Sequence, residues 1–195
     1  MNKVVITSCF IALFLLGCTT TENSTFVKSQ DTILVVGPCP GIGWTNFAHP
    51  PQVNKEHVFC GEISNGRAKG FHSRPGAQNP ATVTSFVITQ AANAAGVYGG
   101  TVSLNIHGVT AQKFSTMFPD SCSEEEVVNS ISYAAVNQIA CPAAAPNWAV
   151  CGYSRPEPVL PTQGPYCEGD DGSQITIAMG LLANGNVNTG FPLRL

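Results

Sequence analysis

The sequence predicts an α+β fold in which a helix packs against an antiparallel sheet. Three segments, 83–88, 97–106 and 175–182, are rich in the β-branched and apolar residues that strands favour. A further strand, 187–191, is expected after the turn dipeptide Asn184-Gly185. One helix, marked by sequence signals at both of its ends, is expected between the second and third of these strands.

The N-terminus is typical of a secretory signal. Lys3 precedes an apolar run over 4–16, which is too short to span a bilayer as a mature helix. The run closes with LLGC at 15–18, which resembles the lipobox of bacterial lipoproteins. We therefore expect a lipoprotein signal peptide over 1–17 and an acylated Cys18 that anchors the protein to a membrane. An ordinary signal peptide with an incidental cysteine is the alternative.

A polar stretch rich in Thr, Ser and Asn follows the signal. It predicts a flexible tether over 18–31 and a single folded domain over 32–195. The signal implies an exported protein, either a cell-envelope lipoprotein at the outer membrane or facing the periplasm, or a released form. With 8 basic and 12 acidic residues the mature chain carries a net charge of −4. Any contact with nucleic acid therefore requires a local basic patch.

Six cysteines remain once Cys9 leaves with the signal and Cys18 takes lipid. In an exported chain an even number favours disulfides, and spacing alone leaves the connectivity open apart from a local pair, Cys141 with Cys151. We expect no metal site, because no cysteine pair has the two-residue spacing of zinc knuckles. The disulfide candidates are Cys39, Cys60, Cys122, Cys141, Cys151 and Cys167.

The first third of the folded domain predicts short elements. Residues 32–36 are rich in strand-forming residues, and a Gly- and Pro-rich turn follows them. The segment 53–63 begins as a helix former and looks extended over 58–61. Asn65-Gly66 then predicts a hairpin turn, which would fold His57 and His72 towards each other.

The helix is predicted over 124–140. Ser123 and Glu126 form a capping box at its start, and Pro142 stops it. The proline-rich segment 141–167 is then expected to be a loop that is long for a compact domain unless disulfides cross-link it.

His57 and His72 are the leading catalytic candidates, since two imidazoles in one cleft suit acid–base chemistry near neutral pH. Arg67, Lys69 and Arg74 surround His72 and form a basic cluster in an acidic chain. A solvated turn with ordinary charges is the alternative interpretation.

The other titratable groups have weaker claims. His49 and His107 are expected to be structural or exposed. Glu62 has only Glu56 as an acidic neighbour, so the carboxylate pair of a glycosidase is a poor match.

Three motifs in order carry a family resemblance. HVFCGEISNGRAKGFHSRP (57–75) resembles the signature of bacterial EndoU nucleases, with one His before a Gly-Glu segment and one in a Gly-Phe-His-Ser pattern. KFSTMFPDSCSEEEV (113–127) is similar to the family's Ser-Thr-x-Phe-Pro segment, and NVNTGFP (186–192) is similar to its closing Thr-x-aromatic-Pro strand.

The resemblance implies a barnase-like nuclease architecture and a cofactor-free endoribonuclease that cleaves RNA, its partner, to a 2′,3′-cyclic phosphate. His72 would be the general base and His57 the general acid, although the two roles can be exchanged. Thr189 matches the catalytic-site hydroxyl residue that contacts the base, often uracil. Phe191 stands where many members have a stacking Tyr, which leaves the strictness of uridine preference open.

The family's lysine is missing. It is expected near 96–104, where this chain has Tyr98 and Gly99, so Lys113, Lys69 or Arg67 would have to supply the charge. The predicted substrate-binding residues are Phe191, Arg67, Lys69, Arg74 and Lys113.

Two other classes of function remain open. One is a weak or inactive RNA-binding envelope lipoprotein on the same scaffold, which the missing lysine favours. The other is a structural envelope protein held by disulfides. The presence of His57, His72 and Thr189 together argues against both. A toxin role, with a cognate immunity protein as partner, is one of several biological roles that the sequence leaves open.

Overall fold

The computed structural model describes residues 39, 43–45 and 51–195. Several sequence predictions lie outside these residues: the signal peptide, the acylated Cys18, the tether, the strand over 32–36 and the placement of His49. Within the described part the fold is α+β, with antiparallel strands and one α-helix. No helix in these ranges is long and apolar enough to cross a membrane.

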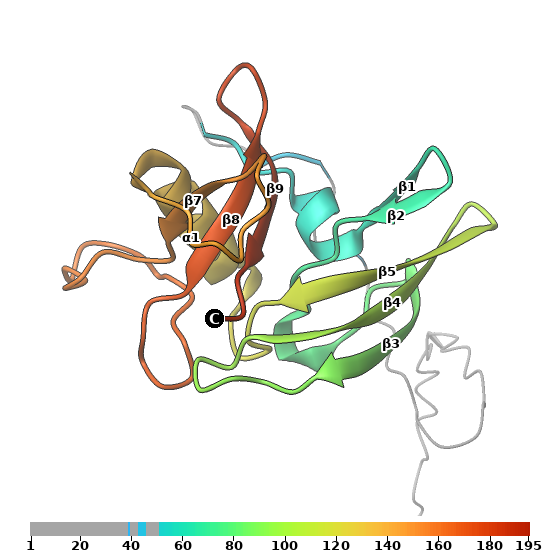
Figure 1. Cartoon of the computed structure of the whole chain (residues 1–195), viewed down its shortest axis with the longest axis horizontal. Helices are drawn as coiled ribbons and strands as arrows, with labels where there is room; N and C mark the ends of the chain where they lie inside the picture. Colours follow the sequence, from blue (N-terminus) through green and yellow to red (C-terminus); the bar gives the residue numbers. More distant parts are fainter. Residues whose placement is uncertain (1–38, 40–42, 46–50) are drawn as a thin grey trace, which may run out of the picture. The chain divides into compact units, whose positions relative to one another are not determined.

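The strands form three antiparallel sheets (Figure 1). The first sheet is a hairpin of β1 (Glu62–Ser64) and β2 (Arg67–Lys69). The second has the order β3 (Val83–Gln90), β4 (Tyr98–Ile106) and β5 (Val109–Met117). The third has the order β6 (Gln138–Ile139), β7 (Val150–Tyr153), β8 (Thr176–Leu181) and β9 (Val187–Pro192).

The predicted hairpin is confirmed. Asn65 and Gly66 both have positive φ, 52° and 69°, as the tightest hairpin turns require. The turn brings Glu62 opposite Lys69. This hairpin joins the segment that carries His57 to the segment that carries His72.

The expectation of an extended segment over 58–61 was wrong. Residues Glu56–Cys60 form a π-helical turn, η1, in which the Gly61 amide donates to the Glu56 carbonyl oxygen at 3.1 Å. Four of its five residues are buried, and the Cys39–Cys60 disulfide ties down its last residue. Packing therefore overrides the β propensity of Val58 and Phe59.

Strand β5 was not predicted. Only Ser115 and Met117 are buried, and the exposed positions mix apolar Val109 and Phe114 with polar Thr110 and Gln112. The strand is instead defined by its pairing with β4 across the turn at His107 and Gly108, which both have positive φ. A strand whose exposed positions mix apolar and polar residues gives no clear apolar periodicity to detect.

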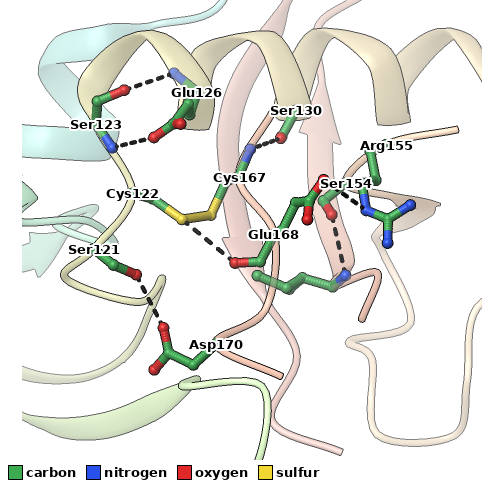
Figure 2. The surroundings of a disulfide bond; sticks show 11 residues. Ser121, Cys122, Ser123, Glu126, Ser130, Ser154, Arg155, Cys167, Glu168 and Asp170 are labelled. Carbon is green, nitrogen blue, oxygen red and sulfur yellow. Dashed lines mark hydrogen bonds and ion pairs between the residues drawn. A yellow bond between two sulfur atoms is a disulfide. The ribbon is translucent and has the colours of Figure 1, made fainter. Parts of the chain in front are cut away.

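Helix α1 (Glu124–Val136) begins where predicted and ends earlier. The Ser123 Oγ accepts from the Glu126 amide at 3.2 Å, and the Ser123 amide donates to the Glu126 carboxylate at 2.7 Å, which completes the capping box (Figure 2). The predicted end at Ala140 was wrong, because Asn137 caps the helix and the next two residues form β6 against β7.

The main core lies between α1 and the sheet of β7, β8 and β9. The helix buries Val127, Val128, Ile131 and Ala134, as its apolar pattern predicts. A Cβ on Gly152 of β7 would lie 2.4 Å from the Ala134 carbonyl oxygen, so glycine is needed for this close approach.

All six predicted cysteines form disulfides: Cys39–Cys60, Cys122–Cys167 and the predicted local pair Cys141–Cys151. The segment 141–167 is not wholly a loop, because it contains β7. Its far end is attached by Cys122–Cys167 to the residue that precedes the N-cap of α1, and the Cys167 amide donates to Ser130 Oγ of α1 at 2.8 Å (Figure 2).

Candidate active site

A cavity of about 680 Å³ collects most of the predicted site residues. Its walls come from β2, β5 and β9, from the segment after β2, and from the loop before β7. The lining residues include His57, Lys69, Gly70, His72, Lys113, Ser115, Trp148, Thr189, Phe191 and Arg194.

The backbone fixes the two histidines relative to each other. The Phe71 amide donates to the His57 carbonyl oxygen at 2.8 Å, and the His72 amide donates to the Val58 carbonyl oxygen at 2.7 Å. On the other side, the Phe118 amide donates to the His72 carbonyl oxygen at 2.9 Å. His72 is therefore held between η1 and the end of β5, and its position depends on both.

Gly70 makes this close approach possible. Its φ is +69°, and a Cβ there would lie 2.0 Å from the His57 carbonyl oxygen. The next residue, Phe71, also has a positive φ of 57°, which is a strained conformation for a bulky side chain. Its buried ring packs edge-on against Phe86, and this packing holds the strained turn in place.

The two imidazole rings lie side by side in the cavity wall. Their centroids are 6.3 Å apart and their planes differ by 29°. His57 is 5% exposed and His72 is 7% exposed. Both rings are close enough to act on one small group, such as a phosphodiester, bound in the cavity.

The surroundings of His72 favour a neutral ring. Its Nδ1 lies 3.1 Å from the Thr116 carbonyl oxygen and 3.0 Å from Ser115 Oγ. A carbonyl oxygen only accepts, so Nδ1 carries the proton and Nε2 is left as the basic nitrogen. Burial, and secondarily the charge of Lys113, holds the pKa of His72 well below its ordinary value of 6.5.

His57 differs from His72 in having a carboxylate beside it. Its Nδ1 lies 3.5 Å from Glu62 Oε1, an ion-pair distance, although no hydrogen bond of good geometry forms to it among the described residues. Burial lowers the pKa of His57, and Glu62 raises it again in part. Of the two rings, His57 is therefore the one that holds a proton more readily.

Lys113 supplies a cation to the cavity wall that holds the histidines. Its Nζ donates to the Gly70 carbonyl oxygen at 2.7 Å and to Ser115 Oγ at 3.2 Å. Its third N–H has no partner within the described part of the chain, and burial lowers the pKa of Lys113 to about 8. The amine is thus positioned to donate to an anion in the cavity.

Tyr98 and Gly99 occupy the positions where the family's lysine is expected. Tyr98 donates to Asp120 through a short hydrogen bond and accepts from Arg74 Nε at 2.7 Å. A Cβ on Gly99 would lie 2.5 Å from the ring of Phe114. No long side chain fits there without moving that ring.

Two of the predicted basic residues do not line the cavity. Arg74 is bound to Asp120 at 3.1 Å and lies over the ring of Phe86, with its guanidinium carbon 4.9 Å from the ring centroid. Its role in the structure is to brace the segment after His72. Arg67 lies exposed at the start of β2, and His107 lies exposed in the turn before β5.

Thr189 and Phe191 lie on β9 and line the cavity with the histidines. The Phe191 ring stacks near His72, with centroids 5.1 Å apart and planes differing by 29°. Thr189 faces Gly180 across the β8–β9 pairing. A hydroxyl and an aromatic ring beside two imidazoles suit a planar polar ligand such as a nucleobase.

Sequence reasoning missed several residues that line the cavity, among them Ser115, Trp148 and Arg194. Trp148 comes from the loop closed by Cys141–Cys151, and Arg194 follows β9. The only sequence signal for either was residue type, since tryptophan and arginine are common in binding sites. In the described ranges, no group of three or more His, Cys, Asp or Glu side chains is placed to hold a metal ion.

Comparison with known proteins gives one match. A family model described as Bacterial EndoU nuclease matches residues 51–194, which include the whole of the cavity wall named above. No curated protein and no solved structure matches the chain.

Proposed function

Since the chain belongs to the bacterial EndoU nuclease family, we propose that this nuclease cleaves RNA 3′ of uridine without a metal. The 2′-hydroxyl attacks the neighbouring phosphorus, the bond to the 5′-oxygen breaks, and the product ends in a 2′,3′-cyclic phosphate. The antiparallel sheets and helix α1 also support a barnase-like nuclease architecture as part of this proposal.

The observation that carries the proposal is the unequal pair of histidines in one cavity. His72 is neutral, with its proton on Nδ1 and Nε2 as the basic nitrogen, so it takes the proton from the 2′-hydroxyl. His57 has Glu62 beside it, so it holds the proton that the departing 5′-oxygen receives. The different surroundings of the two rings favour this assignment over the reverse one.

Lys113 takes the place of the missing lysine in this proposal. Its amine lies on the same wall as both histidines, and its charge lowers the pKa of each. It would stabilise the extra negative charge of the phosphorane. Lys69 and Arg194 lie on the cavity wall and add positive charge that attracts the RNA backbone.

Thr189 and Phe191 would hold the base of the cleaved nucleotide. The Thr189 hydroxyl both donates and accepts, so it matches the adjacent carbonyl and N–H groups of uracil. Phe191 offers a stacking surface without the hydroxyl of a tyrosine.

The direct test is incubation of the purified protein with an RNA oligonucleotide that contains one uridine, in the presence of EDTA. We expect a single cut on the 3′ side of the uridine. Cuts spread evenly over all four nucleotides would refute the uridine preference and leave RNA cleavage standing.

The dependence of kcat/KM on pH should show an optimum below 6.5. Activity needs protonated His57, so it falls as the pH rises through a pKa that burial has lowered below 6.5. It also needs neutral His72, so it falls as the pH drops through a pKa that lies lower still.

The Glu62→Gln variant should move the alkaline limb to lower pH, because it removes the carboxylate that raises the pKa of His57. An alkaline limb that Glu62→Gln leaves in place would refute the role given to His57.

We also propose that the protein is exported and lipid-anchored through Cys18. The three disulfides support an oxidising compartment, where such bonds form and persist.

A further inference from the structure

Trp148 lies at the rim of the active-site cavity with 62% of its surface exposed. A single exposed aromatic side chain is ordinary on a protein surface. Trp148 differs because its ring is held in one place beside the site. Neither the histidine chemistry nor the uridine pocket described above makes use of it.

Three features hold the indole. The loop that carries it is closed by the Cys141–Cys151 disulfide. Within the loop, two tight turns form, since the amides of Ala145 and Ala149 donate to carbonyl oxygens three residues earlier at 2.9 and 3.0 Å. The ring also lies against β8, where a Cβ on Gly180 would be 3.2 Å from Trp148 Cζ3. A ring fixed in this way loses little side-chain entropy when a ligand stacks on it.

The ring contacts run in series across the cavity. The distance between ring centroids is 6.3 Å from His57 to His72, 5.1 Å from His72 to Phe191, and 6.0 Å from Phe191 to Trp148. In the proposed reaction the leaving 5′-oxygen, which belongs to the 3′ nucleotide, meets His57. The base of the cleaved uridine meets Phe191. The next position in the series, at Trp148, then belongs to the nucleotide on the 5′ side of the uridine.

We propose that Trp148 is a stacking subsite for the base of the nucleotide 5′ to the cleaved uridine. This inference rests on the proposed function. The Phe191 and Trp148 planes differ by 56°, so the two rings are not stacked on each other. The exposed indole can therefore receive a base of its own. Every base has a π face, so the subsite accepts any base and favours the larger purines.

The test compares two trinucleotides that differ in one base. One is adenosine-uridine-adenosine, and the other has an abasic residue in place of the first adenosine. For the wild-type protein, kcat/KM should be about 5-fold or more higher with the adenine present, as expected for one stacked base. Trp148→Ala should bring this ratio close to one, and Trp148→Phe should restore part of it. Asn147→Ala, an exposed neighbour in the same loop that does not line the cavity, should leave the ratio unchanged.

If Trp148→Ala lowers kcat/KM by the same factor for both trinucleotides, the residue only braces the loop and the subsite proposal is wrong. The subsite proposal is also wrong if the wild-type protein has the same kcat/KM for the two trinucleotides. If the protein cleaves neither trinucleotide, the proposed reaction fails, and the subsite is then judged by binding alone. For that purpose the dissociation constants of the same pair are measured with 2′-deoxyuridine in the centre, which removes the nucleophile. The adenine should again tighten binding by about 5-fold or more in wild-type protein and not in Trp148→Ala.

Discussion

Replacing either His57 or His72 with alanine is expected to lower the rate of RNA cleavage by about 100-fold to 10,000-fold. Each change removes one of the two proton transfers, one to His72 and one from His57. The measurement is single-turnover cleavage of a uridine-containing oligonucleotide, with the fold monitored by circular dichroism. The double variant should be little slower than either single variant, because the two rings act as one unit.

His107→Asn is the matched control for these variants. His107 is exposed in the turn before β5, with a φ of +51° that asparagine tolerates. The His107→Asn variant should retain wild-type activity. If the folded His57→Ala and His72→Ala variants both cleave at near-wild-type rates, the two-histidine mechanism is wrong.

Removing the Cys122–Cys167 disulfide should have the largest effect on stability. The bond closes a loop with a sequence separation of 45 residues, which corresponds to about 4 kcal/mol of unfolding free energy in the chain-entropy account. The Cys122→Ala, Cys167→Ala double variant keeps the buried positions small and apolar. Its unfolding free energy is measured by urea denaturation.

The Cys141→Ala, Cys151→Ala double variant is the comparison, because its bond spans only 10 residues. It should lose about 3 kcal/mol, less than the Cys122–Cys167 variant. A smaller loss for Cys122–Cys167 than for Cys141–Cys151 would contradict the account. It would mean that other contacts already hold the long loop, namely the hydrogen bond from the Cys167 amide to Ser130 (Figure 2) and the ion pairs of buried Arg155 with Glu157 and Glu168.

Local chemistry made part of the fold predictable. The start of α1 follows from the capping pair Ser123 and Glu126, and the β1–β2 hairpin follows from Asn65-Gly66. In both cases the residues that specify the structure are neighbours in the chain. The apolar strands β4, β8 and β9 were predicted because their burial is strong enough to show in composition.

The elements that sequence reasoning missed depend on contacts between distant residues. The π-helical turn η1 depends on burial and on the bond from Cys60 to Cys39. Strand β5 depends on its partner β4, and helix α1 stops where β6 pairs with β7. Propensity carries none of this information, because tertiary packing decides the outcome.

In the candidate site, too, some residues could be identified from local sequence and others only from the fold. The two histidines were predicted from their motif, and the structure brings them into one cavity. Nearness in sequence to His72 gave Arg74 a binding role, whereas Asp120 from a distant segment holds its side chain. Lys113, which is 41 residues from His72 along the chain, lies in the cavity through the β5 pairing. Which cation reaches the site is therefore a property of the fold.

Attack by the 2′-hydroxyl of one nucleotide defines the proposed reaction, and a chimeric substrate isolates this step. An oligodeoxynucleotide with a single ribouridine offers one such nucleophile, and the same strand with 2′-deoxyuridine offers none. In the presence of EDTA, we expect one cut 3′ of the ribouridine, a product whose mass shows a 2′,3′-cyclic phosphate, and an intact deoxyuridine strand. Cleavage of the deoxyuridine strand, or a first product that ends in a linear phosphate, would contradict it.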